Sequence, residues 1–418
     1  MSYLGNSIIL GVLMAYSNTA RRYGSIAKLL HWSIALGIVT MIPLGIVAMN
    51  MPYDTPEALA QKALLFSVHK TIGVALFFLA LVRIGWAISQ PRPAPLHPDR
   101  KVETALAEVT HWLLYGSLIL VPLSGWVHHA ATTGFAPIWW PFGQSLPFVP
   151  QDTGVADAAA ALHIIFERVL VVSLLLHLVG ALKHHVWDKD DTLRRMLPGL
   201  TEADAPPHPR KHATGVTGAV AVWAIAIGIG AGIGVFDHKT QSASAAELAA
   251  VESDWAVTDG TLAITIKQMG ADVTGTFAEW TAAITFDPET VDDTKGTVAV
   301  DVSIGSLTLG SVTGQAMGAD YFNAEAFPTA QFTAAILEAE NGYVADGVLR
   351  LRGAEVPLRL PFSLTLEGDV AQMTGTVTVD RRDFGIGDTM TNTGQLAFEV
   401  VIGVTLTAIR GGGDAPAG

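Results

Sequence analysis

The chain has 418 residues, of which 50% are hydrophobic and 15% charged, and its mean hydropathy is +0.40. It is too apolar for an ordinary soluble protein, yet too uneven to be embedded in a membrane throughout. The net charge of −13 argues against nucleic-acid binding. The absence of Cys excludes disulfides, thiolate metal sites and cysteine nucleophiles.

The charge divides the chain into two parts. Residues 1–236 contain 16 Lys and Arg against 13 Asp and Glu, whereas residues 237–418 contain 9 against 25. No His lies beyond residue 238. This asymmetry predicts a multidomain protein whose two halves have different functions.

Five apolar runs are long enough to cross a bilayer as helices, which takes roughly 20 residues. They fall at about 29–49, 66–88, 108–128, 161–183 and 214–236. Residues 1–19 precede them as a short apolar extension, with Met14 as an alternative start. A signal peptide is the weaker reading of this extension, because no charged segment precedes it.

The loop charges predict the orientation, because cytoplasmic loops collect Lys and Arg. Positive residues precede the first run, separate the second from the third, and follow the fourth, whereas the loop at 129–160 has none. We therefore expect a cytoplasmic N-terminus, a cytoplasmic Pro-rich linker at 201–213, and a fifth span that carries the chain to the periplasm. The fifth run contains several glycines and reads as a tether, although its small residues also suit packing on the bundle.

From about residue 251 to residue 410, after a linker at 237–250 and before a tail at 411–418, the pattern changes to alternation. Stretches such as TLAITIKQ and GTVAVDVSI have the period of half-buried strands. Roughly eight such strands, separated by Gly, Asp and Asn turns, predict an all-β sandwich or antiparallel barrel.

Four histidines lie inside the apolar runs at two depths. His163 and His177 are fourteen residues apart, so on a helix they share one face at a separation of roughly 21 Å. His31 begins the first run at the cytoplasmic depth of His177, and His69 begins the second at the periplasmic depth of His163. Ionisable residues inside a membrane are costly and usually functional.

Two pairs of imidazoles at two depths are what stacked bis-histidine haems require. Two imidazoles fill both axial positions of a haem iron and leave an electron-transfer centre. A zinc site would need further ligands, and the runs contain no HExxH motif or carboxylate cluster, which also disfavours a metal-dependent hydrolase. The alternative is a purely structural role, in which each of the four histidines hydrogen-bonds to a neighbouring helix.

Three further polar residues are weaker candidates in the same runs. His111 is a candidate for a quinone pocket or a propionate contact, or an ordinary interhelical histidine. Arg83 and Arg168 are candidate propionate partners. Extension towards the lipid headgroups is the alternative for Arg83, and ion pairing is the alternative for Arg168.

Residues 20–200 resemble the bacterial cytochrome b561 family in LLHW at 29–32, FSVHKTIG at 66–73 and HHVWDKDDTLRRMLP at 184–198. The resemblance implies a four-helix dihaem bundle of the inner membrane with two haems b, bound by His31, His69, His163 and His177. It also implies electron exchange with quinone or quinol, with ubiquinone as the expected quinone. Some members of the family oxidise superoxide, and others accept electrons from quinol.

Residues 251–410 resemble the YceI-like family of periplasmic lipocalin-like barrels, in TGTFAEWTAAITFDPE at 274–289, GADYFNAEAFPTAQF at 318–332 and RRDFGIG at 381–387. The resemblance implies an isoprenoid lipid or quinone inside the barrel. QMG at 268–270 departs from the His-containing strand common in that family. The aromatic residues of the matching stretches are candidates either for ligand contact or for core packing: Phe322, Phe327, Phe332 and Phe384.

These observations favour an inner-membrane dihaem cytochrome with a fifth transmembrane helix and a periplasmic all-β barrel. Electrons would pass between the quinone pool and a periplasmic donor or acceptor, with superoxide as one candidate, and the barrel would bind an isoprenoid or quinone. The alternative is an isoprenoid carrier whose membrane half is mainly an anchor. If the chain is an enzyme, the resemblance implies an electron-transfer oxidoreductase of the cytochrome b561 type, with superoxide:ubiquinone oxidoreductase as one candidate activity.

Overall fold

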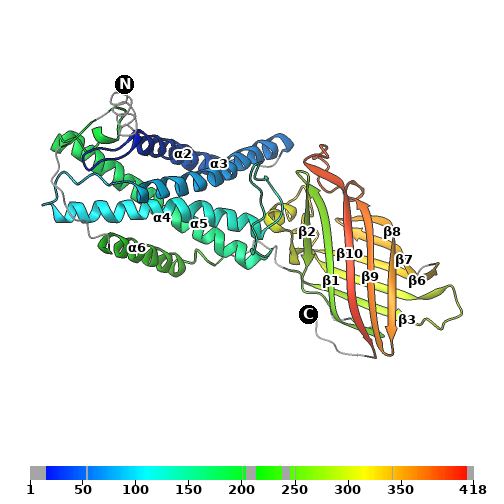
Figure 1. Ribbon diagram of the computed structural model, residues 1–418. Helices are drawn as coiled ribbons and strands as arrows, with labels where there is room; N and C mark the ends of the chain where they lie inside the picture. The colour runs from blue at the N-terminus through cyan, green and yellow to red at the C-terminus, as the bar shows by residue number, and fades with distance from the viewer. Residues whose placement is uncertain are drawn as a thin grey trace, which may run out of the picture. The chain divides into compact units, whose positions relative to one another are not determined.

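The computed structural model describes residues 16–52, 55–199, 201–203, 213–237, 245–249, 251–340 and 342–411. Within these residues the chain forms two compact units, one built from helices and one from strands (Figure 1). Most of the expected N-terminal extension, of the two linkers and of the tail lies outside the described residues.

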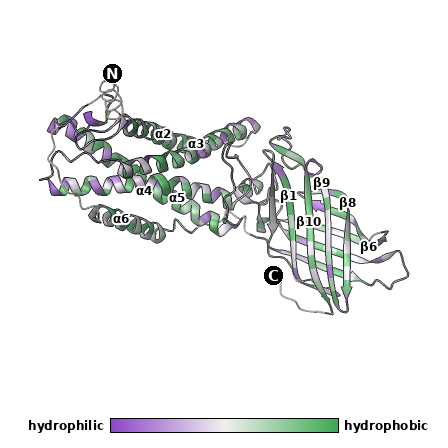
Figure 2. Cartoon of the chain, viewed as in Figure 1, coloured by the Kyte–Doolittle hydropathy of each residue, from purple (hydrophilic) through white to green (hydrophobic). Residues whose placement is uncertain are grey.

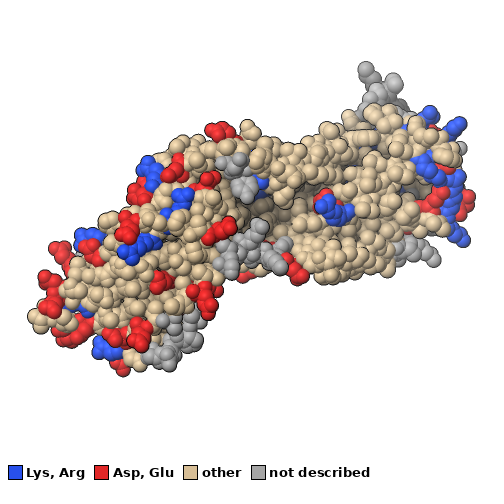
Figure 3. All heavy atoms as spheres, turned by 180° about the vertical axis from the view of Figure 1, so that it is seen from behind, with Lys and Arg blue, Asp and Glu red and all other residues tan. Residues whose placement is uncertain are grey.

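The described part of the helical unit contains five helices that are long and apolar enough to cross a membrane. They are α2 (Ser25–Asn50), α3 (Pro56–Ser89), α4 (Lys101–Ala131), α5 (Thr153–Lys183) and α6 (Ala213–Gly232). The first four apolar runs predicted from the sequence lie within α2 to α5, and the fifth, 214–236, begins in α6 but extends past its end at Gly232. Hydrophobic residues dominate all five (Figure 2), and on the face in Figure 3 charged side chains gather towards one end of the bundle. The chain is a multi-pass membrane protein.

Helix α6 packs on the bundle rather than serving as a bare tether. Ala219 of α6 is buried with Leu113 of α4 and Val169 of α5. The ring of Trp223 lies directly over Gly116, where a Cβ atom would collide with it. Small residues allow such close approach between membrane helices. Of the two alternatives for the fifth span, packing on the bundle is therefore confirmed.

The second unit is a ten-stranded antiparallel sheet that curls into a half-barrel (Figure 1). Its order is β3-β4-β6-β7-β8-β9-β10-β1-β2-β5. The strands are β1 (Trp255–Gln268), β2 (Ala271–Phe277), β3 (Trp280–Phe286), β4 (Thr294–Ser303), β5 (Leu307–Thr308), β6 (Thr329–Ala339), β7 (Gly342–Leu351), β8 (Ala354–Glu367), β9 (Val370–Asp380) and β10 (Leu396–Arg410).

The expectation of roughly eight strands was low by two. The stretch TGTFAEWTAAITF contains the end of β2 and the whole of β3, because the chain turns at Ala278 and Glu279. Strand β5 has two residues and is too short to show a pattern. The hairpin between β1 and β2 turns at Met269 and Gly270, whose φ angles are 50° and 81°, as tight hairpin turns require.

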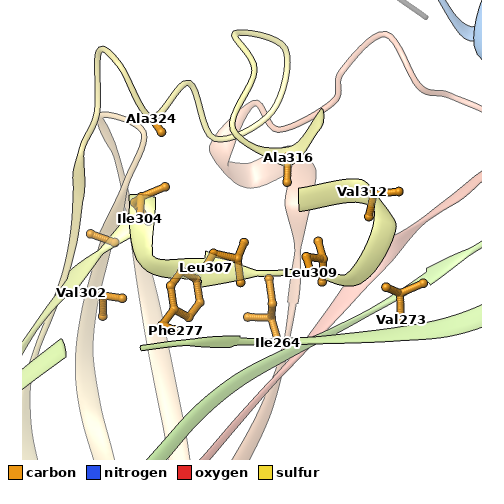
Figure 4. Close-up of a cluster of buried hydrophobic side chains, with 11 residues drawn as sticks. Ile264, Val273, Phe277, Val302, Ile304, Leu307, Leu309, Val312, Ala316 and Ala324 are labelled. Atoms are coloured by element: carbon orange, nitrogen blue, oxygen red, sulfur yellow. The ribbon is translucent and has the colours of Figure 1, made fainter. Parts of the chain in front are cut away.

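One end of the half-barrel is covered by the segment between β4 and β6. This segment contains β5, the 3-10 helices η3 (Ile304–Ser306) and η4 (Gly310–Val312), and the short helix α7 (Thr313–Ala316). Leu307 and Leu309 point from it towards Ile264 and Phe277 of the sheet (Figure 4). The buried cluster fixes the segment to the sheet, since each fully buried side chain of this kind stabilises the fold by roughly 1.5–3 kcal/mol.

Candidate functional site

The four membrane histidines lie at two levels of the bundle, with a packed apolar core between them. Helices α2 to α5 each contribute buried side chains to this core, from positions about halfway along each helix. They are Ile34 and Ile38 of α2, Ala80 of α3, Leu118 of α4 and Leu170 of α5. The helical geometry therefore separates two polar sites within one apolar bundle.

The first site joins α2 and α5. The imidazole rings of His31 and His177 have their centroids 6.1 Å apart and their planes inclined at 58°. A metal between two imidazole nitrogens, at about 2 Å from each, would leave the ring centroids roughly 6 Å apart. The spacing of this pair therefore fits a haem iron held between the two rings.

His111 and Arg83 surround the same pair. The ring centroid of His111 lies 5.3 Å from that of His177, which leaves less room for a metal than the 6.1 Å of the first pair. His111 Nδ1 also donates to the carbonyl of Ala107, at 2.7 Å. Arg83 Nη2 donates to His31 Nδ1 at 3.1 Å, and its guanidinium lies 5.7 Å from the ring centre of Tyr115. His111 and Arg83 are thus placed around the pair, and His31 is the better-spaced partner of His177.

The second site joins α3 and α5. His69 lies close enough to His163 for an electrostatic interaction. His163 Nδ1 donates to the carbonyl of Val121 at 2.8 Å, which leaves its Nε2 as the free lone-pair nitrogen. A backbone acceptor at Nδ1 is the usual way in which a metal-binding histidine is oriented.

Two glycines make room for these rings. A Cβ at Gly45 would lie 2.9 Å from Cε1 of His69, and a Cβ at Gly125 would lie 3.0 Å from Nδ1 of His163. The bare backbone lets α2 and α4 approach the imidazoles closely. The residues present therefore fit a group held between His69 and His163.

Arg168 is placed differently from Arg83. Its side chain is 73% exposed and forms an ion pair with the adjacent Glu167, at 3.3 Å between Nη1 and Oε2. This is the ion-pairing alternative considered for it. Arg83 alone of the two candidate arginines contacts a candidate axial histidine.

The half-barrel encloses a separate apolar cavity of about 270 Å³. Inward-facing residues of the strands line it, including Leu262, Val300, Leu360, Val377 and Val404. The alternation seen in the sequence therefore supplies the lining, because every second residue of a strand faces the same side.

The four polar side chains of the lining gather at one end of the cavity. They are Gln268, Gln315, Tyr321 and Arg381. Gln315 Nε2 donates to the Tyr321 hydroxyl at 3.0 Å. All five N–H groups of Arg381 donate to backbone carbonyls, those of Ile386, Gly387, Met390, Leu396 and Ala397. The Tyr321 hydroxyl hydrogen therefore remains for a ligand, whereas the Arg381 donors do not.

The candidate aromatic residues of the barrel separate into two kinds. Phe322, Phe332 and Phe384 line the cavity. Phe327 instead packs against Gly353, where a Cβ would lie 3.3 Å from its ring. Three of the four are therefore placed to touch a ligand, and all four also pack within the fold.

Sequence reasoning missed Gly45, Gly125, Gln315 and Tyr321. A signal for the glycines existed, because each helix of the bundle repeats one spacing of fourteen residues. The pairs are His31 and Gly45, His69 and Arg83, His111 and Gly125, and His163 and His177. The Gln315–Tyr321 pair had no comparable signal, since α7 is a four-residue helix without a periodic pattern.

Comparison with known proteins agrees with this division of the chain. Residues 22–199 match the prokaryotic cytochrome b561 family, and residues 249–408 match the YceI-like domain. Cytochrome b561 homolog 2 of Escherichia coli (strain K12) is 34% identical over 196 residues, which cover 46% of this chain and 98% of that protein. The probable superoxide oxidase CybB of Yersinia pestis is 30% identical over 132 residues, covering 31% of this chain and 73% of that protein.

Solved structures match the strand unit. Burkholderia cenocepacia BcnA is 26% identical, with a TM-score of 0.34, over 35% of this chain and 95% of that one. A Campylobacter jejuni YCEI protein is 15% identical, with a TM-score of 0.30, over 41% of this chain and 95% of that one.

The fold and the paired histidines define a membrane cytochrome domain followed by a barrel domain. The chain belongs to the prokaryotic cytochrome b561 family, with a YceI-like domain fused at its C-terminal side. Membership of that family implies haem b.

Proposed function

We propose that the chain transfers electrons across the inner membrane between the quinone pool and a periplasmic partner, through two haems b. The observation that carries this proposal is the 6.1 Å spacing of the His31 and His177 rings, which suits one iron held between two imidazoles. His31 and His177 would hold the haem on the cytoplasmic side, and His69 and His163 the haem on the periplasmic side.

Haem b held by two histidines would supply an iron that accepts and releases single electrons. The chain supplies the orientation of those imidazoles. The Val121 carbonyl holds the Nδ1 proton of His163, so that Nε2 is presented as the ligand atom. Gly45 and Gly125 lack side chains and so leave room for the rings of His69 and His163. The core of Ile38, Leu118 and Leu170 excludes water between the two levels.

Arg83 has a second role in this proposal. In the present structure it donates to His31 Nδ1, which puts the proton of a neutral His31 on Nε2. If His31 held a haem through Nε2, its proton would lie on Nδ1, and the Arg83 guanidinium could no longer donate there. Arg83 would then be free to pair with a carboxylate, and a haem propionate is the carboxylate at hand.

The orientation follows from the loop charges, with the N-terminus cytoplasmic and the barrel periplasmic. A reporter fused after residue 418 should report the periplasm, and one inserted near residue 206 the cytoplasm; the opposite pattern would contradict the orientation. Superoxide is one candidate donor on the periplasmic side, because a Yersinia pestis relative is described as a probable superoxide oxidase.

The barrel would hold an isoprenoid chain ending in a neutral acceptor group, such as a quinone. Its lining is apolar apart from one end, so burial of hydrocarbon supplies most of the affinity, at roughly 25 cal/mol per Å². The Arg381 donors are all used, which disfavours a phosphate head. The Tyr321 hydroxyl can donate to a carbonyl oxygen, and it is held in place by Gln315.

Reduction of the purified full-length protein by ubiquinol tests the electron-transfer role. The reduced-minus-oxidised spectrum should show b-haem bands after ubiquinol is added without any other reductant. Bands that form with dithionite but not with ubiquinol would contradict exchange with the quinone pool. A protein without b-haem bands would favour the carrier whose membrane half is an anchor.

A further inference from the structure

The motif HHVWDKDD, which follows α5, takes no part in the proposed electron transfer. Its first five residues form the π-helical turn η1 (His184–Asp188). Lys189 then adopts a left-handed conformation with φ 53°, and the Asp190 N–H donates to the carbonyl of His184. This turn returns the chain on itself, so that the Asp190 carboxylate lies beside the His184 ring.

His97, from the connection between α3 and α4, completes a cluster with these two residues. Asp190 Oδ2 lies 2.7 Å from His184 Nδ1 and 3.1 Å from His97 Nε2. The two imidazoles are stacked with centroids 6.0 Å apart and planes inclined by 8°. The three possible ligand atoms all lie within 4.8 Å of one another.

These distances are close to those of a metal site. In tetrahedral coordination with bonds of about 2.0–2.1 Å, neighbouring ligand atoms are roughly 3.3 Å apart. To admit an ion, the distances from Asp190 Oδ2 to His184 Nδ1 and to His97 Nε2 would have to lengthen by about 0.6 and 0.2 Å. Such a movement is within the reach of side-chain rotation.

Asp190 is prepared as an anionic ligand. Its Oδ1 accepts the backbone N–H of Thr192 at 2.8 Å, which directs Oδ2 at the histidines. Its Oδ2 lies within hydrogen-bond distance of both His184 Nδ1 and His97 Nε2. Carboxylates that bind a metal are usually held in position by a hydrogen bond from a second residue, as Thr192 holds Asp190 here.

The neighbouring acidic residues are neutralised by cations. Asp188 Oδ2 lies 3.1 Å from Arg100 and 3.0 Å from Lys183, and Lys183 also contacts Glu103 at 2.7 Å. Asp188 also lies 3.1 Å from His184 Nδ1, but its charge is already balanced. The ion-pair contacts of Asp190 are with the two imidazoles, which are neutral ligands when they bind a metal.

We propose that His97, His184 and Asp190 bind a divalent transition-metal ion of the Zn²⁺ type. Two imidazole nitrogens and one carboxylate oxygen suit zinc rather than Mg²⁺ or Ca²⁺, which prefer oxygen ligands. The side chains of His97 and His184 are 33% and 24% exposed, so water can complete the coordination and the ion can exchange. The bound ion joins the α3–α4 connection to the end of α5.

Zinc content of the full-length haem-loaded protein tests the proposal. The protein carries a tag without histidines, is dialysed against Zn²⁺ and then against metal-free buffer, and its zinc and haem iron are measured by mass spectrometry. The wild type should retain about one zinc per chain. His97→Asn and Asp190→Asn should each weaken Zn²⁺ binding at least tenfold, since loss of even a supporting residue costs about that much.

His185→Asn is the matched control, because His185 is adjacent to His184 but exposed and outside the cluster. It should retain zinc like the wild type. Haem content reports whether each variant is folded, and His97→Asn lies in a connecting segment where a folding defect is least expected. Wild-type protein without retained zinc would overturn the proposal. Equal zinc in the wild type, His97→Asn and Asp190→Asn, or equal loss in His185→Asn, would overturn it as well.

Discussion

The two units of this chain build their candidate sites in opposite ways. In the helical unit, polar side chains such as His31 and His177 are exceptions within apolar helices. In the half-barrel the lining is apolar, and polar side chains such as Tyr321 are exceptions at one end. Affinity in the first unit should therefore depend on single ligand atoms, and affinity in the second on the summed apolar area. Single substitutions should accordingly have large effects in the helices and modest ones in the barrel.

Loss of an axial histidine is the largest expected effect. His31→Ala and His177→Ala should each remove the same haem, and His69→Ala and His163→Ala the other, because one imidazole cannot hold the bis-histidine coordination. Haem per chain, measured as the pyridine haemochrome, should fall from two to one in all four. His111→Ala should keep both haems, because its 5.3 Å ring spacing to His177 suits a metal less well than the 6.1 Å of His31. Matching spectra for His31→Ala and His163→Ala would contradict the pairing.

Substitutions that fill the space beside the His69 and His163 rings should have the next largest effect on haem content. Gly125→Val and Gly45→Val place a side chain where even a Cβ would lie 3.0 Å or less from an imidazole atom. Overpacking of this kind costs about 1–3 kcal/mol, which corresponds to about 5- to 160-fold weaker binding of the haem held by His69 and His163. The control is Gly180→Val in α5, where a Cβ meets no atom within 4 Å. If both variants kept the full content of the haem held by His69 and His163, the space beside these two glycines would not be needed for haem binding.

Removal of the Arg83 charge should shift the midpoint potential of the haem held by His31 and His177 without lowering the haem content. Arg83→Met deletes a positive charge near the His31–His177 pair, which favours the oxidised iron. A change of about 1 kcal/mol lowers the midpoint potential of that haem by about 40 mV. Potentiometric titration of both haems measures it. Arg168→Met is the control, because Arg168 is exposed and pairs with Glu167. An equal shift of the midpoint potential in Arg83→Met and Arg168→Met would contradict a specific interaction of Arg83 with this haem.

The smallest expected effect lies in the barrel. Tyr321→Phe deletes one hydrogen-bond donor from an otherwise apolar lining, at a cost of about 1 kcal/mol or about fivefold in quinone affinity. Native mass spectrometry of the full-length chain can follow quinone occupancy against added ubiquinone. Tyr343→Phe is the matched control, since Tyr343 stacks on Phe362 and does not line the cavity. A loss greater than a hundredfold in Tyr321→Phe would mean that the head group, not the apolar chain, supplies the affinity.

The membrane helices could be predicted from the sequence, because hydropathy acts over whole helices. The pairing of the histidines as haem ligands stays a prediction, which rests on helical spacing. His31 and His177 accordingly lie at the predicted level together. The contacts of Arg83 and Arg168 could not be predicted, because long side chains choose among several partners in three dimensions. The Gln315–Tyr321 pair depends on a short irregular segment, where no periodicity indicates which residues face inwards.

The strand pattern likewise indicated the sheet but not its full extent. Strand β5 pairs with β2 through Thr276 and Phe277 alone, which is too short a register to leave a signal in the sequence. The cavity follows from the curl of the whole sheet, which depends on long-range pairing such as that of Trp255 with Arg410.

The haem content of the full-length protein tests the central claim most directly. Pyridine haemochrome assay against protein mass, determined on membranes solubilised without loss of pigment, gives the number of haems b per chain. Two histidine pairs at two depths predict a ratio of two. A reproducible ratio of one, or of none, would contradict the dihaem assignment.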